Sequence, residues 1–244
     1  MSKIITVWGS PCSGKTTTAV KLALSIYQET KKKIIIVSCD DQTPSIPILF
    51  PHLKNPELFS VGNILKQPQI TDKEILKNLI VDKRNKDIGY LCYSNSENKY
   101  SYPAYDEVKA FSLLSILKEI ADYVLVDCTS SNDNILSVSA LQKADFSISL
   151  VTPDIKSISF YISQTPLYFE PEYEKSKKLI VINNTENDVY APIEETRNYF
   201  KKISVVIPYN KEIKLQVANG ELQKGIPDRK YRQKLEQLKD MVMI

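Results

Sequence analysis

The feature that most constrains this chain is the octapeptide Gly9-Ser-Pro-Cys-Ser-Gly-Lys-Thr16, which follows the pattern G-x-x-x-x-G-K-[ST]. It comes directly after a short apolar run at residues 4–8. It leads into residues 17–28, where apolar side chains recur with helical spacing. A strand, this turn and a helix in that order form a loop that binds phosphate through backbone amides and the helix N-terminus. The sequence therefore predicts a polyphosphate site at the end of the first strand.

Each fixed position of this phosphate loop has a physical reason. Glycine at positions 9 and 14 lets the backbone come close to a ligand, where a Cβ atom would collide. Lys15 is placed to reach the outer phosphates, and the Thr16 hydroxyl is placed to bind a Mg²⁺ ion that bridges them. Cys12 lies in the loop itself and is a candidate for a reactive thiol. The residues expected to contact the nucleotide in this loop are Gly9, Ser10, Pro11, Cys12, Ser13, Gly14, Lys15, Thr16 and Thr17.

The rest of the chain alternates between strand and helix patterns, and its 244 residues suit one domain. This alternation predicts an α/β fold with three layers, a mostly parallel central sheet with helices on both faces. Further strands are expected at residues 34–37, 89–93, 123–127, 146–151, 179–182 and 205–207. Further helices are expected at residues 72–84, 106–121, 134–142, 193–200 and 228–243, with another opening at Thr152-Pro-Asp154.

The pattern is less regular at about residues 43–105. Five prolines interrupt residues 43–88, and only residues 72–84 have helical spacing there. The segment is either an effector region or a long surface excursion. Five tyrosines between residues 90 and 105 fit an interaction surface or ordinary strand composition.

Two acidic residues follow predicted strands. Asp127 ends the apolar run at residues 123–126, the position of the second magnesium element in enzymes with a phosphate loop. Asp40 follows the strand at residues 34–37 and is a candidate for magnesium binding or water positioning, or else an ordinary turn residue. The polar residues 129–134 stand where a loop that senses the γ-phosphate would be.

Composition excludes some classes of protein. Basic and acidic side chains nearly balance, 32 against 29. The net charge of the whole chain therefore does not require a nucleic acid or an anionic membrane as a binding partner. We expect no secretory leader, no spanning helix and a cytoplasmic protein whose four cysteines stay reduced. The basic C-terminal residues 201–240 could contact DNA phosphates or acidic lipid headgroups, or form a solvated helix face.

Taken together, these segments resemble the MinD/ParA family of ATPases and their relative, the nitrogenase iron protein. The resemblance covers nearly the whole chain, from the phosphate loop and first helix at residues 7–23 onward. Val37-Ser-Cys-Asp40 is similar to the family's first switch and Asp122-Tyr-Val-Leu-Val-Asp127 to its second. Leu150-Val-Thr-Pro-Asp154 resembles the strand that follows, and residues 206–208 and 218–220 resemble the late nucleotide-side segment.

This resemblance implies an ATP-binding protein that uses Mg²⁺. Lys15, Thr16 and Thr17 would bind phosphates and the metal, Asp40 would position the attacking water and Asp127 would hold the metal's water. Asn183 and Pro208 would lie beside the adenine. Thr16, Asp40 and Asp127 are thus the expected metal group, and Lys15, Asp40 and Asp127 the expected catalytic residues.

One departure from the family matters for activity. The family usually has a lysine after the first glycine of the loop, and it reaches across a dimer to the partner's nucleotide; here the position is Ser10. Losing a cation that faces developing phosphoryl charge weakens catalysis by orders of magnitude. The iron–sulfur cysteines of the nitrogenase relative are not matched, so we predict no cluster.

Three functions stay open at this point. The first is a Mg²⁺-dependent ATPase whose nucleotide state controls a protein partner, with an ATP-dependent homodimer and a location at membrane or nucleoid as extensions. The second is an ATP-binding localisation or scaffold module with negligible hydrolysis. The third is a kinase or ligase related to dethiobiotin synthetase, which needs a substrate pocket near residues 43–51 and 129–133.

Overall fold

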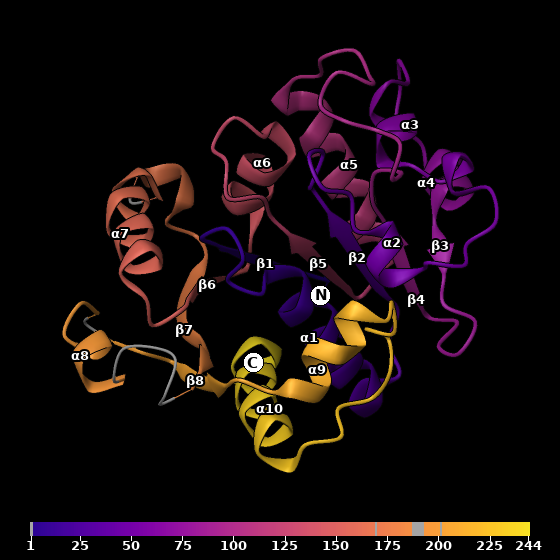
Figure 1. The fold of residues 1–244 in the computed structure, drawn as a ribbon. Helices are drawn as coiled ribbons and strands as arrows, with labels where there is room; N and C mark the ends of the chain where they lie inside the picture. The colour runs from indigo at the N-terminus through magenta and orange to yellow at the C-terminus, as the bar shows by residue number, and fades with distance from the viewer. Residues whose placement is uncertain (1, 169, 187–192, 201) are drawn as a thin grey trace.

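An eight-stranded sheet forms the centre of the computed structural model, which describes residues 2–168, 170–186, 193–200 and 202–244 (Figure 1). The strands are β1 (Lys3–Gly9), β2 (Ile34–Ser38), β3 (Ile80–Val81), β4 (Ile88–Leu91), β5 (Tyr123–Asp127), β6 (Phe146–Val151), β7 (Lys177–Thr185) and β8 (Val205–Pro208). Their order is β3-β4-β2-β5-β1-β6-β7-β8. Only the edge pair of β3 and β4 is antiparallel, so the predicted, largely parallel sheet is confirmed.

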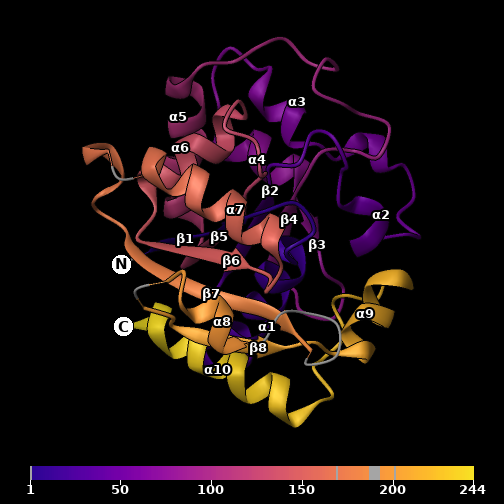
Figure 2. The ribbon, with the colours of Figure 1, turned by 60° about the vertical axis from the view of Figure 1, so that its left-hand side comes forward.

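Helices cover both faces of this sheet, as two views of the ribbon show (Figures 1 and 2). The helices are α1 (Lys15–Thr30), α2 (Ile46–Leu49), α3 (Val61–Leu65), α4 (Asp72–Asn78), α5 (Glu107–Ile120), α6 (Ile135–Lys143), α7 (Ile155–Gln164), α8 (Ile193–Arg197), α9 (Lys211–Ala218) and α10 (Arg229–Met243), with 3-10 turns η1 (Pro56–Leu58), η2 (Thr165–Tyr168) and η3 (Pro171–Tyr173). α1 and α10 pack together on one face, and α3 to α7 lie on the other. The three-layer architecture is therefore confirmed.

Alternate residues of the central strands supply the two halves of the core. In β1, Ile5 and Val7 belong to the cluster under α1 and α10, whereas Ile4 and Trp8 belong to the cluster under α5 and α6. All four side chains are buried, since helices cover both faces. This is why the strands appear in the sequence as continuous apolar runs.

Side-chain caps begin most of the longer helices. Asp106, Asn134, Asp154, Asn210 and Asp228 each accept a hydrogen bond from the backbone N–H three residues later. Such caps satisfy an amide that the helix itself leaves free. α1 differs, because its N-cap is a glycine with no side chain to accept a hydrogen bond.

The helix expected at residues 72–84 is shorter than predicted. α4 ends at Asn78, and residues 80–81 form the edge strand β3 against β4. Asn78 is buried, its amide donates to the Glu74 carbonyl at 2.9 Å, and its side-chain oxygen accepts from the Ser60 amide at 3.4 Å. The β-branched pair Ile80 and Val81 then suits a strand, so the helical prediction beyond Asn78 was wrong.

Several short helices were not predicted. α2, η1 and α3 lie inside the segment that seemed irregular, and α9 follows β8. Tertiary contacts hold these elements: Ser60 caps α3 and also donates to Glu97 at 2.6 Å, and the Tyr102 ring packs directly over Gly62. The tyrosine-rich segment thus folds back over α3, and the periodicity of so few residues gives no signal of it.

Among the helices of the described residues, none has both the length and the apolar character needed to cross a bilayer.

A buried lysine joins α1 to the C-terminal part of the chain. Lys21 is fully buried, and its ammonium donates to the carbonyls of Leu222 at 2.7 Å and Lys224 at 2.6 Å and to the side-chain oxygen of Gln216. Burial lowers the pKa of Lys21 to about 8. The lysine therefore remains charged near neutral pH, and three acceptors compensate its burial.

Replacing this lysine tests how much the connection stabilises the fold. We expect Lys21→Met to lower the free energy of unfolding by about 1–3 kcal/mol, because the acceptors lose their donor. Urea titration measures the change, and Lys73→Met on the exposed surface of α4 is the matched control, expected to change little. Equal stabilities of the two variants would contradict this role for Lys21.

Candidate functional site

The predicted phosphate loop, residues 9–16, lies where the carboxyl ends of β1, β2 and β5 meet. The register pairs Val7 of β1 and Ser38 of β2 with Asp127 of β5. The strands are parallel, so their last residues share one edge of the sheet. Gly9, Ser38 and Asp127 are therefore close in space although they lie far apart in the sequence.

Both fixed glycines of the loop are required by its backbone. Gly9 has φ of 152°, and a Cβ atom there would lie 2.3 Å from the Leu150 carbonyl oxygen. Gly14 has φ of 90°, and a Cβ atom there would lie 2.6 Å from the side-chain nitrogen of Asn183. Larger residues at either position would strain the turn and collide with a neighbouring strand.

The last turn of the loop has backbone amides without a hydrogen-bond partner among the described residues. Among the described residues, no acceptor takes the backbone N–H of Gly14, Lys15, Thr16 or Thr17, and the first such bond in α1 is from Thr18 to the Gly14 carbonyl at 2.9 Å. Successive unpaired amides at a helix N-terminus attract negative charge. Phosphate binding by the loop stays a prediction.

Lys15 turns back over the loop. Its ammonium donates to the carbonyls of Ser10 at 2.9 Å and Gly9 at 3.3 Å and to the hydroxyl of Ser130 at 2.7 Å. Burial lowers the pKa of Lys15, and the nearby carboxylate of Asp127 opposes that shift. The cation thus lies inside the loop, next to the amides that follow it.

Thr16 and Asp127 form the closest polar pair of the site. The Thr16 hydroxyl donates to the Asp127 carboxylate at 2.6 Å, and the Ser38 hydroxyl lies 3.5 Å from the same oxygen. Asp127 is 3 % exposed, and burial raises its pKa to about 6 despite the hydrogen bond from Thr16 and the charge of Lys15. A hydroxyl and a carboxylate are hard oxygen ligands, which suit Mg²⁺.

Asp40 is at the same edge but bonds to its own loop. One carboxylate oxygen accepts from the amides of Thr43 at 2.8 Å and Gln42 at 3.0 Å, and the other accepts from the Thr43 hydroxyl at 2.9 Å. This is the turn that an aspartate commonly forms after a strand. Its charge influences Lys15 and Asp127, but no hydrogen bond joins it to either residue.

Ser10 faces the interior. It is buried and its hydroxyl lies 2.7 Å from the Ser157 hydroxyl in the first turn of α7. The Ser10 side chain is therefore directed toward α7 and does not extend out of the loop. Pro11 and Cys12 form the exposed tip of the loop, with Cys12 at φ of 61°.

Asn183 supports the loop from β7. Its amide donates to the Ser13 carbonyl at 2.8 Å, while its side-chain oxygen is buried and has no partner among the described residues. Pro208 ends β8 and pairs with Thr185. Of the two residues expected beside an adenine, Asn183 therefore contacts the loop and Pro208 lies on the neighbouring strand.

Sequence reasoning missed the side chains that join the loop after β5 to the phosphate loop and to the loop after β2. Ser130 accepts from Lys15 and donates to the Gly9 carbonyl at 2.7 Å, and Asn134 donates to the Cys39 carbonyl at 2.9 Å. Lys99, from the tyrosine-rich segment, forms an ion pair with Asp133. The polar run at residues 129–134 was the available signal, but it did not single out Ser130 or Asn134.

The side chains at this edge that could bind a metal ion are few. The described residues contain no group of three or more histidine, cysteine, aspartate or glutamate side chains that could hold a metal ion. Magnesium sites in nucleotide enzymes commonly use one or two protein oxygens together with phosphate oxygens and water. Thr16 and Asp127 fit that kind of site.

Comparisons with known proteins identify the fold. No protein-family model matches the chain, and no curated protein sequence resembles it significantly. Solved structures do match over nearly the whole length. A MinD protein of Pyrococcus horikoshii in complex with Mg-ADP has a TM-score of 0.74 and 17 % identity, covering 99 % of this chain and 96 % of that protein.

Two further solved structures are similar over the whole length. A putative plasmid partition protein of Borrelia burgdorferi bound to AMPPNP has a TM-score of 0.77 and 18 % identity, covering 100 % and 99 %. A ParA family ATPase of Chlorobium tepidum has a TM-score of 0.77 and 17 % identity, covering 100 % and 98 %. The chain therefore has the fold of the MinD and ParA ATPases, and the expected resemblance is confirmed at the level of fold.

The raised pKa of Asp127 predicts a variant that is more stable than the original. An unfolded carboxyl group ionises near pH 3.8, whereas Asp127 in the fold ionises near pH 6. The stabilisation from its proton is fully present below pH 3.8 and is lost as pH rises through about 6. At neutral pH the buried charge therefore opposes folding, by ~3 kcal/mol at most.

We expect Asp127→Asn to raise the melting temperature at neutral pH, while the two proteins converge in acid, where the carboxyl group is protonated. Thermal unfolding followed by circular dichroism across this pH range measures both effects. Asp133→Asn is the control, because that carboxylate is exposed and the ion pair with Lys99 lowers its pKa. A variant less stable than the parent at neutral pH would contradict the burial argument.

Proposed function

We propose that this chain is a Mg²⁺-dependent ATP-binding protein and an ATPase of the MinD/ParA type, acting as a nucleotide-controlled switch for positioning or assembling a partner. The observation that supports it most is the convergence of Lys15, Thr16 and Asp127 at the edge of the sheet, next to unpaired loop amides. The structures of the same fold that contain Mg-ADP and AMPPNP support the choice of ligand.

In this proposal the chain binds ATP through the loop. The amides of residues 14–17 receive phosphate oxygens, and the Lys15 ammonium exchanges the carbonyls of Gly9 and Ser10 for the outer phosphates. Thr16 and Asp127 hold the metal, which neutralises charge on the phosphates. Asn183 and Pro208 lie beside the base.

The same contacts suggest how the site could switch. Ser130 is hydrogen-bonded to Lys15, so movement of the ammonium toward a γ-phosphate removes one anchor of the loop after β5. Asn134 of that loop bonds to Cys39, which precedes Asp40. A change in one loop therefore reaches the other through a single hydrogen bond. In this account Asp40 leaves its turn and positions the attacking water.

Slow hydrolysis is the second candidate, and the position of Ser10 favours it. The MinD/ParA resemblance leads one to expect a lysine there, but this chain has a buried hydroxyl bonded to Ser157. The protein would then be an ATP-binding localisation or scaffold module. The cavity beside Asp133 offers little support for a kinase or ligase. It has a volume of about 240 Å³, and Lys99 is the only basic side chain that lines it within the described residues. Lys99 is already paired with Asp133.

A partner, an ATP-dependent homodimer, and contact with DNA or membrane are parts of this proposal that need direct measurement. The basic residues at the start of α10 are exposed, although Arg232 donates to the carbonyls of Ile226 and Pro227. Cytoplasmic location, with peripheral attachment to membrane or nucleoid, likewise belongs to the proposal.

The first test concerns binding. Lys15→Ala removes the cation from the loop, and we expect ATP affinity, measured by calorimetry with Mg²⁺, to fall at least ~100-fold, because charge-assisted contacts to phosphate are strong. Lys33→Ala, an exposed lysine before β2, is the control and should bind as the parent does. Tight ATP binding by a folded Lys15→Ala protein would contradict the site.

The second test separates the two candidates. Phosphate release is measured with ATP alone and with DNA, anionic vesicles or partner proteins, and the mass in solution is measured with ATP, with ADP and with neither. An ATPase switch predicts turnover and a nucleotide-dependent mass. Asp40→Asn should then retain ATP binding and lose at least ~10-fold in rate. Tight ATP binding without turnover under any condition would contradict the ATPase and favour the scaffold module.

A further inference from the structure

The cavity beside Asp133 lies where three segments that are far apart in the sequence meet. Asp41 comes from the loop after β2, residues 133–135 come from the loop after β5 and the start of α6, and residues 98–105 come from the tyrosine-rich segment. Its volume of about 240 Å³ is below the range for drug-sized ligands, roughly 300–1,000 Å³. The cavity therefore suits a small molecule or a single side chain.

Four tyrosines line this cavity: Tyr93, Tyr100, Tyr102 and Tyr105. The Tyr93 and Tyr102 rings lie 6.4 Å apart, and a hydrogen bond joins the side chains of Tyr93 and Tyr105. Tyr100 is 87 % exposed, and its side chain has no hydrogen bond or ring contact with another described residue. The face of an aromatic ring carries partial negative charge and attracts cations, so an exposed ring of this kind favours a cationic ligand.

Asp41 supplies a carboxylate that is not paired with a cation. It forms no ion pair with a described residue, and its only hydrogen bond among them is with its own amide. Burial raises the pKa of Asp41; its own amide opposes this shift, and the charge of Asp40 adds to it. A partly buried carboxylate next to another negative charge is stabilised when a cation binds beside it.

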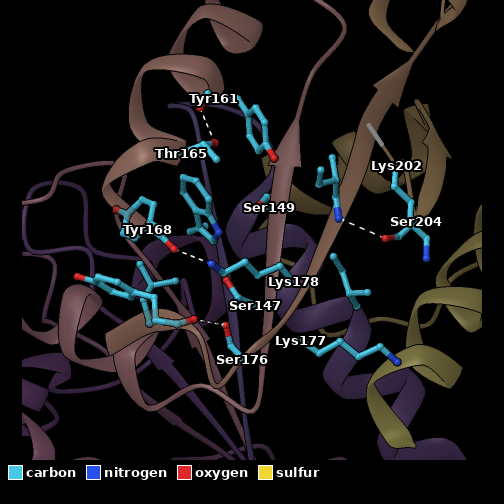
Figure 3. Close-up of a pocket in the computed structure, with 15 residues that line it drawn as sticks. Ser147, Ser149, Tyr161, Thr165, Tyr168, Ser176, Lys177, Lys178, Lys202 and Ser204 are labelled. Atoms are coloured by element: carbon cyan, nitrogen blue, oxygen red, sulfur yellow. Dashed lines mark hydrogen bonds between the residues drawn. The ribbon is translucent and has the colours of Figure 1, made fainter. Parts of the chain in front are cut away.

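The charge of the lining also favours a cation. Asp41 and Asp133 line the cavity, and the one basic side chain among the described lining residues, Lys99, is paired with Asp133. The cavity of about 390 Å³ between α7 and the sheet is different, because three lysines and no acidic side chain line it among the described residues (Figure 3). A small cation would therefore prefer the cavity beside Asp133.

A guanidinium group fits the combination of rings and carboxylate better than other organic cations. It is planar, it stacks on aromatic rings, and it can donate two parallel hydrogen bonds to one carboxylate. An ammonium group is more strongly hydrated, and a quaternary ammonium group has no N–H to donate to Asp41. The lining thus distinguishes between classes of cation.

We propose that the cavity beside Asp133 binds a guanidinium group, which donates to the Asp41 carboxylate and packs against the Tyr100 ring. The group belongs either to a free alkylguanidinium compound or to an arginine side chain. This site does not depend on the function proposed above, because no residue of the phosphate loop lines the cavity.

NMR titration of the isotope-labelled protein without nucleotide tests the proposal. Butylguanidinium is the probe, and butylurea is a neutral molecule of nearly the same shape. We expect butylguanidinium to shift the amide signals of Asp41, Tyr100 and Asp133 in a saturable way. Butylurea should bind at least ~10-fold more weakly because it lacks the charge, and butylammonium should lie between the two.

A second ligand identifies where the group comes from. The methylamide of N-acetylarginine presents guanidinium as an arginine side chain within a protein does. Binding at least as tight as that of butylguanidinium would support the proposal with an arginine side chain as the ligand. Weaker binding of the arginine derivative alone would support it with a free compound.

Two variants locate the bound group. Asp41→Asn keeps the shape of the side chain and should weaken butylguanidinium at least ~10-fold, with butylurea unchanged. Tyr100→Leu removes the exposed ring and should weaken butylguanidinium ~3-fold. Glu236→Gln and Tyr199→Leu, which are exposed and do not line this cavity, are the matched controls.

Three results would overturn the proposal. The first is no saturable shift of the amides that line the cavity. The second is equal affinity for butylguanidinium and butylurea, which would mean that the charge is not recognised. The third is unchanged butylguanidinium binding in either folded variant. Tyr100 is exposed and its replacement does not disturb the core, so Tyr100→Leu tests the site even if Asp41→Asn fails to fold.

Discussion

The pairing of β1 with β5 on one side and β6 on the other is the constraint on which the site depends. β5 sets Asp127 beside Val7, and β6 brings the Leu150 carbonyl so close to Gly9 that no side chain fits there. The start of the loop and the carboxylate opposite it are thereby fixed relative to each other by backbone hydrogen bonds. Thr16 then needs only the first turn of α1 to reach Asp127.

This dependence on backbone explains how much of the site the sequence predicts. The positions of Lys15, Thr16 and Asp127 follow from strands that run parallel and end at one edge, a rule that needs no knowledge of side-chain packing. All the strands except the short edge strand β3, and the long helices, follow from apolar runs, helical spacing and capping residues, which are local signals. For the same reason the fold of distant relatives is shared at 17 % identity.

What the sequence does not predict depends on segments that meet only in the folded chain. The bond between the hydroxyls of Ser10 and Ser157 joins residues 147 positions apart, and Ser130 meets Lys15 across 115 positions. Asp40 had two possible roles, and the local turn with Thr43 satisfies its carboxylate.

The buried Lys21 has a consequence for the opposite end of the molecule. It lies fewer than two turns along α1 from Lys15, and its ammonium connects this helix to the carbonyls of Leu222 and Lys224. A rotation or axial shift of α1 must either carry the chain before α10 with it or break contacts that water cannot replace in the interior. Events at the amino end of the helix are thus mechanically connected to the basic surface formed by the last helix.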